Sequence, residues 1–219
     1  MRSSLDIFYF DLEVDPKSKK VLEYGAMLNS SQYRGKEQLR FEALSKEAST
    51  VCGHNIIQHD LTVLKENNFP DSFFKKSKID TLYLSVLFFP KKPYHDLVKD
   101  YHLNGTEINN PHADARLAKE LLEDVLVAFQ NLSKQLRTIY YSLLKEIAGF
   151  DGFFKHISSS DLPIIYDKKE LARFIKIYFA KSFCREADLL RLILNHPIEL
   201  AFAMAIITCL LYTSPSPRD

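Results

Sequence analysis

A short apolar run near the start of the chain constrains the fold more than any other feature. Residues 5–12 are rich in Ile, Phe and Tyr, a composition that favours a buried β-strand. Side chains alternate between the two faces of a strand, so Asp11 and Glu13 lie on the same face. Two carboxylates at the end of a buried strand repel each other unless a cation lies between them. The pattern indicates a metal site, and the alternative is an acidic strand end that turns into solvent at Asp15.

Strand patterns alternate with helix patterns over the first part of the chain. Further strands are expected over residues 21–28 and 50–56, and helices over residues 37–48, 58–65, 80–88 and 95–101. Such alternation is typical of an α/β domain. The domain is expected to cover residues 1–130.

The strongest helix pattern begins at Asn110. Asparagine is a favoured N-cap, and Pro111 suits the first helical position because its missing N–H would have no partner there. Apolar residues then recur at helical spacing, at Leu117, Leu121, Val125 and Phe129. Asp114 shares this face and is expected to point inward. The alternative is a first-turn acid that the helix dipole favours.

Another acid follows a Gly-His-Asn triplet at residues 53–55. Asp60 lies three residues from Ile57 and four from Leu64, so it shares a helical face with core residues. An acid in that position is costly unless it is paired or bound to a metal ion. The helix dipole again provides the alternative explanation.

Taken in this order, the acids resemble the pattern of the DEDD (DnaQ-like) 3′–5′ exonuclease superfamily. The family carries Asp-x-Glu on its first strand, Gly-His-Asn-x₄-Asp after a later strand, and an Asp that opens a late helix. The matching residues are Asp11, Glu13, Gly53, His54, Asn55, Asp60 and Asp114. The segment Ile-Asp-Thr-Leu at residues 79–82 resembles a further family element. The resemblance covers about residues 5–128 and implies an RNase H-like fold, a mixed sheet flanked by helices.

The same resemblance implies hydrolysis of phosphodiester bonds at the 3′ ends of single-stranded DNA or, less strongly, RNA. Carboxylates in such a site hold two Mg²⁺ or Mn²⁺ ions. By resemblance, Asp11 bridges both ions, Glu13 and Asp114 hold the ion that generates hydroxide, and Asp60 supports the other. Contact with the terminal nucleotide is implied for Leu12, Asn55 and His54.

The sequence departs from the family at the general base. The family has a His five residues before the last Asp, or a Tyr four before it, whereas this chain has Asn109 and Asn110. Asparagine cannot accept a proton at neutral pH. His112 is close in sequence, but at two residues from Asp114 it is expected to point to another side of the helix. It is either the base or an ordinary first-turn His.

Loss of a general base costs about 10²–10⁴-fold in rate. A second hypothesis is therefore a catalytically weak or silent exonuclease-like module that binds nucleic acid or docks a partner domain. A third hypothesis, a structural adaptor unrelated to nucleic acid, leaves the inward acids unexplained.

Residues 131–208 are expected to be mostly helical, with a break at 149–163 and no motif that indicates chemistry. Residues 192–212 are apolar, but polar residues at 195–199 make a transmembrane helix unfavourable, so no membrane is expected as a partner. The segments 93–101, 109–111 and 197–201 resemble exonuclease domains fused ahead of RecQ-like helicases, which implies a covalently linked helicase domain. Residues 209–219 match the translation of a transposase sequencing adapter and are expected to be an artefact, with the natural chain cut near Thr208.

Charge and cysteine content exclude several classes of protein. The net charge of +1 identifies no partner, but lysines cluster at 17–20, 75–78 and 91–92, either as solvated loops or as contacts to a phosphate backbone. The 3 cysteines lack metal-ligand spacing, so neither a disulfide framework nor a zinc site is expected. With no signal peptide pattern at the start, the sequence predicts a reduced, cytoplasmic protein.

Overall fold

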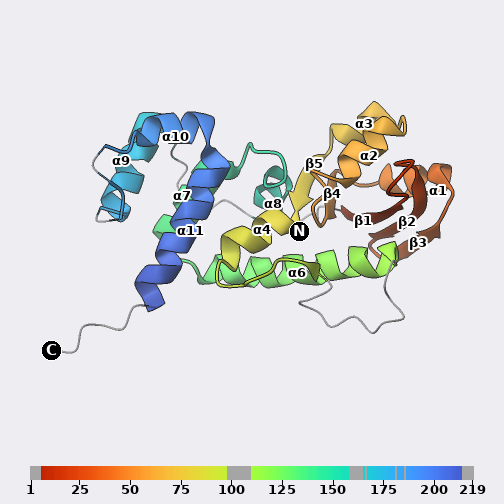
Figure 1. The fold of residues 1–219 in the computed structure, drawn as a ribbon, viewed down its shortest axis with the longest axis horizontal. Helices are drawn as coiled ribbons and strands as arrows, with labels where there is room; N and C mark the ends of the chain where they lie inside the picture. Colours follow the sequence, from red (N-terminus) through yellow and green to blue (C-terminus); the bar gives the residue numbers. More distant parts are fainter. Residues whose placement is uncertain are drawn as a thin grey trace, which may run out of the picture.

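The computed structural model describes residues 6–97, 110–157, 165, 167–180, 182–184 and 186–213. A five-stranded sheet lies at the centre of the first half of the chain (Figure 1). Its strands are β1 (Ile7–Val14), β2 (Val21–Leu28), β3 (Ser31–Gly35), β4 (Thr50–Gly53) and β5 (Ser77–Asp80), in the order β3-β2-β1-β4-β5. The pairs β1–β2 and β2–β3 are antiparallel, whereas β4 is parallel to both β1 and β5. The expected α/β class with a mixed sheet is confirmed.

Two strands escape prediction from the sequence, each for a physical reason. β3 is an edge strand of polar, mostly exposed residues, so it lacks the apolar alternation of a half-buried strand. β5 has only four residues, of which Ile79 alone is apolar. Its place in the sheet comes from pairing with β4 and not from its own composition.

The helices of the first half flank the sheet. They are α1 (Gln38–Ser45), α2 (Asp60–Glu66), α3 (Asp71–Phe74), α4 (Thr81–Phe88) and α6 (Pro111–Asn131). Asn110 caps α6 as expected, because its side chain accepts a hydrogen bond from Ala113 N at 3.3 Å. Within the helix expected over about residues 95–101, His95 and Asp96 are not helical, Leu97 is helical, and residues 98–101 lie outside the described part.

The second half of the described chain is helical, as expected. It contains α7 (Lys134–Leu144), α8 (Asp151–His156), α9 (Lys168–Tyr178), α10 (Leu189–Asn195) and α11 (Pro197–Thr213). The break expected at 149–163 is wrong in part, because α8 lies inside it. Gly152 does not end a helix but lets α8 pack closely on the sheet, since an added Cβ would lie 2.7 Å from Ile79 and 2.8 Å from Thr50.

Each face of the sheet has its own hydrophobic core. Phe8, Phe10 and Leu12 of β1 lie in the core on the side of α1, α2 and α3. Aromatic rings dominate this core, and the Phe8 and Phe41 ring centroids lie 5.1 Å apart in an edge-on arrangement. Ile7 faces the other core, which α4 and α6 cover.

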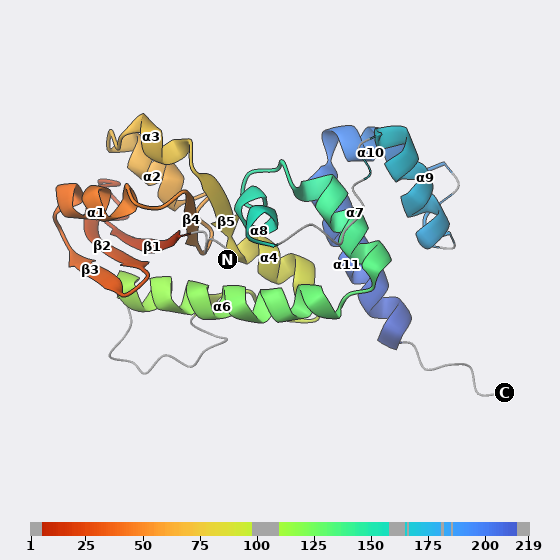
Figure 2. The same cartoon turned by 180° about the vertical axis from the view of Figure 1, so that it is seen from behind.

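The second core continues from the sheet into the C-terminal helices. One cluster of buried side chains includes Ile7, Cys52 and Ile79 of the sheet and reaches Met204 of α11. α6 joins the two halves, with its first turns on the sheet and its last turns beside α7 (Figure 2). At 21 residues it is about 31 Å long. The domain boundary near residue 130 and the artificial origin of residues 209–219 stay predictions.

Within the described residues, every helix is too short or too polar to cross a membrane. Among the described residues, Cys52, Cys184 and Cys209 form no disulfide.

Candidate metal-binding carboxylate site

The site begins where the first turn of α6 rests on the sheet. Asp11 of β1 lies opposite Gly25 of β2 in the antiparallel register, so both residues face the same side. A Cβ added to Gly25 would lie 2.1 Å from the carbonyl carbon of Pro111 and 2.2 Å from the nitrogen of His112. Only glycine permits this approach, which brings the start of α6 against β2 beside Asp11.

Asp60 contacts the same strand, β1, from the side of the sheet that α1, α2 and α3 cover. It is the first residue of α2, only 1% exposed, and its Oδ1 accepts a hydrogen bond from Leu12 N at 3.1 Å. Burial raises the pKa of Asp60, while the bonds from His59 and Leu12 oppose that rise. The expectation that Asp60 points inward is confirmed.

The charges of the other three predicted acids all act on Asp11. Burial raises the pKa of Asp11 well above its usual range, and the charges of Asp60, Asp114 and Glu13 raise it further, in that order. Asp11 keeps some exposed surface, yet protein atoms crowd its carboxylate. The Oδ1 atom of Asp114 is buried as well, which agrees with the expected inward direction of that side chain.

The described acids lie near one another but do not form a complete set of ligands for one metal ion. Within the described residues, no three side chains of His, Cys, Asp and Glu lie where they would hold one metal ion together. The donor set itself suits Mg²⁺ or Mn²⁺, because it consists of carboxylate oxygens whose mutual repulsion a divalent cation would neutralise. The expected pair of ions stays a prediction.

A buried carboxylate that the sequence analysis did not place in the site shapes the turn before Asp60. Asp80 is 0% exposed; its Oδ1 accepts from Asn55 N at 2.9 Å and its Oδ2 from Ile57 N at 3.0 Å. Burial raises its pKa, and these N–H groups oppose that rise. Asn55 has a left-handed backbone, with φ of 61°. Asp80 therefore fixes the path of the chain from β4 into α2. The sequence signal that could have indicated a structural role for Asp80 is its position directly before α4, where Asp is a favoured N-cap.

The side chains expected to contact a nucleotide have different surroundings. His54 Nδ1 lies 3.0 Å from the hydroxyl oxygen of Thr81, and that hydroxyl donates to Gly53 O at 3.1 Å. The side chain of Leu12 is 5% exposed and lies in the aromatic core, so only its backbone faces Asp60. The roles expected for Leu12, His54 and Asn55 stay predictions.

His112, the candidate base of α6, lies near two arginines. Burial lowers its pKa, and the charges of Arg116 on α6 and Arg34 on β3 lower it further. Its Nε2 is buried and has no hydrogen-bond partner in the described part of the chain. Asn109, the position where the family has its His, lies outside the described residues.

His59 is a neighbour of the acids that the sequence analysis missed. Its Nδ1 lies 3.5 Å from Asp60 Oδ2, and this contact raises the pKa of the imidazole. The side chain is about half exposed, so it lies at the edge of the site.

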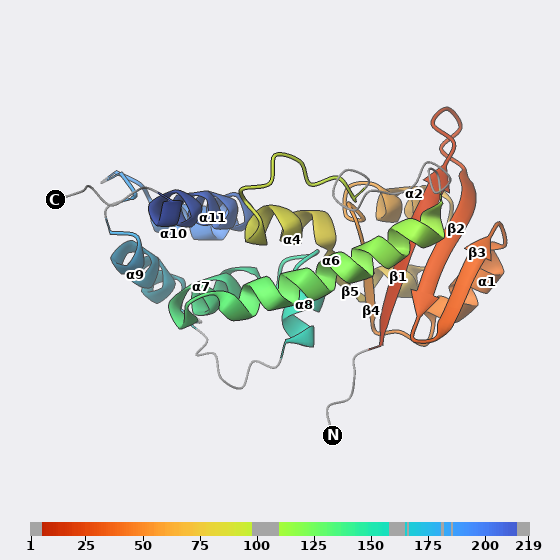
Figure 3. The same ribbon diagram turned by 90° about the horizontal axis from the view of Figure 1, so that it is seen from below.

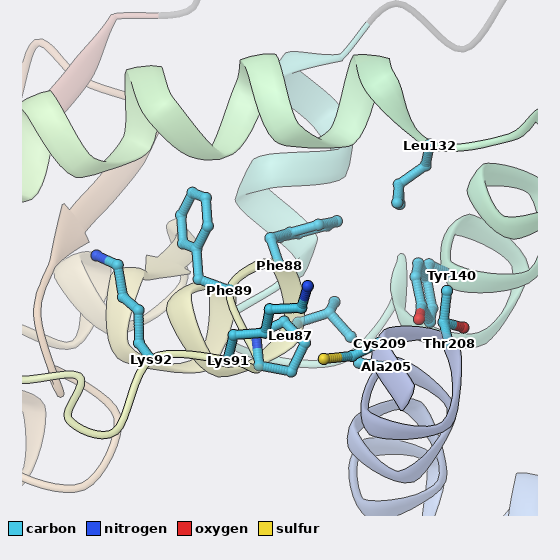
Figure 4. Close-up of a pocket in the computed structure, with 11 residues that line it drawn as sticks. Leu87, Phe88, Phe89, Lys91, Lys92, Leu132, Tyr140, Ala205, Thr208 and Cys209 are labelled. Atoms are coloured by element: carbon cyan, nitrogen blue, oxygen red, sulfur yellow. The ribbon is translucent and has the colours of Figure 1, made fainter. Parts of the chain in front are cut away.

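An apolar pocket lies away from the carboxylates, between α4, α7 and α11 (Figure 4). Its volume is about 340 Å³, and Phe88, Phe89 and Tyr140 lie on its wall. Its described lining residues include no acid, so they offer no metal ligands of the kind gathered around Asp11.

No protein-family model matches the chain, and a comparison with curated proteins gives no match either. The geometry around Asp11 therefore carries the functional argument.

The pKa of Asp11 predicts how the metal-free protein responds to pH. Because the folded state raises this pKa above its ordinary value of 3.8, the folded protein holds a proton that the unfolded chain releases. The proton on Asp11 stabilises the folded state fully below pH 3.8, and this stabilisation is lost as pH rises through the raised pKa of Asp11. Unfolding in chelator should thus show stability that falls from mildly acidic to neutral pH, with a smaller fall in Asp11→Asn.

Divalent ions should restore the stability that the metal-free protein loses as pH rises to neutral. At neutral pH, Mn²⁺ at a hundredfold excess over its Kd is expected to stabilise the parent by about 2.7 kcal/mol. Thermal melts with Mn²⁺ or chelator measure the effect. An unchanged melting temperature at saturating Mn²⁺ would count against a metal site.

Proposed function

We propose that the protein is a metal-dependent 3′–5′ exonuclease that hydrolyses phosphodiester bonds at nucleic-acid 3′ ends, DNA in preference to RNA. The observation that carries this proposal is the environment of Asp11. Acids from three separate elements, β1, α2 and α6, raise its pKa through their charges. Structural acids are rarely gathered in this way, because burial of like charges is costly without a cation.

The arrangement of the sheet supports the RNase H-like part of the proposal. The first three strands form an antiparallel meander, and β4 and β5 follow in parallel on the other side of β1. This order puts the acids of β1 in the central strand, where helices from both faces reach them. Asp60 comes from one face and Asp114 from the other.

The residues have separate parts in the proposed site. Asp11, Glu13, Asp60 and Asp114 would hold Mg²⁺ or Mn²⁺ ions, which supply an activated water and stabilise the leaving oxygen in such sites. Leu12 N orients Asp60 by donating to its Oδ1. Asp80 holds the turn that leads to Asp60 through Asn55 and Ile57.

A catalytically silent module that binds nucleic acid is the second candidate function. Two observations favour it: the acids do not converge on one point in the described residues, and Asn109 stands where the family has its base. Segments 93–101 and 197–201 resemble exonuclease domains fused ahead of RecQ-like helicases. With either function, the proposal therefore includes a covalently linked helicase domain as a partner.

Digestion of labelled oligonucleotides tests the proposal. A single strand labelled at its 5′ end should shorten stepwise from the 3′ end with Mg²⁺ or Mn²⁺ and stay intact with chelator. Parallel reactions with DNA and RNA of the same sequence determine the preference. Asn109→His should raise the rate, by about tenfold to a thousandfold, given the usual range of general-base catalysis. If neither the parent nor this variant trims DNA or RNA, the exonuclease proposal fails.

A further inference from the structure

The turn between β1 and β2 continues from the acid-bearing end of β1. It carries three lysines, Lys17, Lys19 and Lys20, and all three are exposed. In Figure 3 this hairpin protrudes from the edge of the sheet at which α6 begins. Glu13 and Asp11 thus lie directly before the turn in the chain.

The turn has a fixed backbone. Asp15 N donates to Lys20 O and Lys19 N donates to Asp15 O, both at 2.9 Å. The Asp15 carboxylate also accepts from the backbone of Lys17 at 2.9 Å and of Ser18 at 2.6 Å. A turn held by four such bonds presents its lysines without a large cost in backbone entropy on binding.

The turn is also tied to the helix that carries Asp60. Asn67, the C-cap of α2, donates from Nδ2 to Lys19 O at 3.1 Å. Asp60 is the first residue of α2 and Asn67 follows its last, so this bond holds the turn against the helix that carries Asp60.

The other lysine runs have different surroundings. Lys76 donates from Nζ to Ala48 O. Lys78 donates from Nζ to Phe74 O and to Lys76 O, and both of these bonds are 2.8 Å long. Lys92 lies over the Phe89 ring at 5.0 Å, beside the apolar pocket. In the described part of the chain, no ion pair involves Lys17, Lys19 or Lys20.

We propose that this turn binds the phosphodiester backbone of a single strand whose 3′ end lies at the carboxylate site. The inference rests on the proposed function. A cluster of acids repels a polyanion, so a strand held there needs cations at the rim of the cluster. Lysines in a fixed turn supply them, because each neutralised phosphate releases condensed counterions.

Binding measured without turnover tests this proposal. The full chain is titrated, in chelator, against fluorescent oligothymidylate and oligouridylate, and the anisotropy is followed at several salt concentrations. Replacing Lys17, Lys19 and Lys20 together by Gln should weaken binding at low salt at least about tenfold. It should also reduce the slope of log K against log salt by about 2, since each phosphate contact contributes about 0.7 for single strands.

The matched control removes the same charge elsewhere. Lys168→Gln, Lys169→Gln and Lys176→Gln together alter α9, which lies at the far end of the molecule (Figure 1). This variant should bind within about twofold of the parent. If the two triple variants bind equally, or if the parent binds neither oligonucleotide, the proposal is overturned. The double variant Lys17→Gln, Lys20→Gln repeats the test with Lys19 intact, should the triple variant fold poorly.

The outcomes separate this inference from the exonuclease proposal. Affinity that depends on the turn, together with no trimming by the parent or by Asn109→His in Mg²⁺ or Mn²⁺, supports the inference and overturns the exonuclease proposal. Trimming by the parent, with affinity that the turn variant leaves unchanged, overturns the inference alone.

Discussion

Asp11→Asn is expected to abolish metal-dependent trimming, with a fall in rate of at least about 10³-fold. Asp11 is the acid on which the charges of Asp60, Asp114 and Glu13 all act, so in the proposed site Asp11 would hold the cation. A catalytic metal contributes several kcal/mol of transition-state stabilisation, and each 1.36 kcal/mol corresponds to tenfold in rate. The oligonucleotide assay with Mg²⁺ or Mn²⁺ measures the loss.

The same substitution should stabilise the protein in the absence of metal. Asparagine keeps the shape of the side chain but removes one of the crowded charges, so the repulsion that raises the pKa of Asp11 disappears. The melting temperature in chelator at neutral pH should rise while activity is lost. A higher melting temperature together with lower activity excludes unfolding as the cause of the lost activity.

An exposed acid provides the control. Asp71→Asn changes the first turn of α3, and it should leave both rate and stability near those of the parent. Retention of trimming by Asp11→Asn would show that the acids around it do not form the catalytic site.

Gly25→Ala is expected to cost about 1–3 kcal/mol of stability or more, since added volume in a tight contact forces backbone shifts. The new methyl would lie 2.1 Å from Pro111 and 2.2 Å from His112, and both contacts are to backbone atoms that cannot rotate away. α6 must move away from β2, and Asp114 moves with it. Because a misplacement of about 1 Å can cost about 10²-fold in rate, activity should fall to that extent.

Denaturant unfolding and the trimming assay measure the two effects. Gly35→Ala in β3 is the matched control, because its nearest neighbours are the hydroxyl end of Tyr33, at 2.9 Å, and the ring behind it. The Tyr33 side chain can turn, although its hydroxyl then loses its exposed hydrogen bonds with Glu37, whereas a helix backbone cannot yield, so the control should lose less stability than Gly25→Ala. Equal losses in both variants would show that the contact between α6 and β2 does not position the site.

The sequence alone determined the elements whose signals are local. β2 coincides with the strand predicted at 21–28, since its apolar residues follow one another along the chain. Asn110 begins α6 because an N-cap needs only the three residues after it. The inward direction of Asp60 followed from its spacing to Leu64, one helix turn later, whereas Ile57 precedes α2 and is not part of that helical face.

Other features depended on contacts between distant residues. β3 and β5 exist because neighbouring strands complete their hydrogen bonds, and their own residues give little indication of it. α8 crosses a region that its glycines seemed to interrupt, because Gly152 packs on β5. Asp80 acts through backbone groups more than 20 residues away, which no local pattern expresses.

The site itself divides in the same way. The four acids and their order along the chain were readable from the sequence, because residue type and spacing are sequence properties. Their mutual approach required the tertiary structure, since it depends on the contact of Gly25 with Pro111 and on the bond from Leu12 N to Asp60. Charges that lie on three separate elements interact strongly only after folding has removed the water between them.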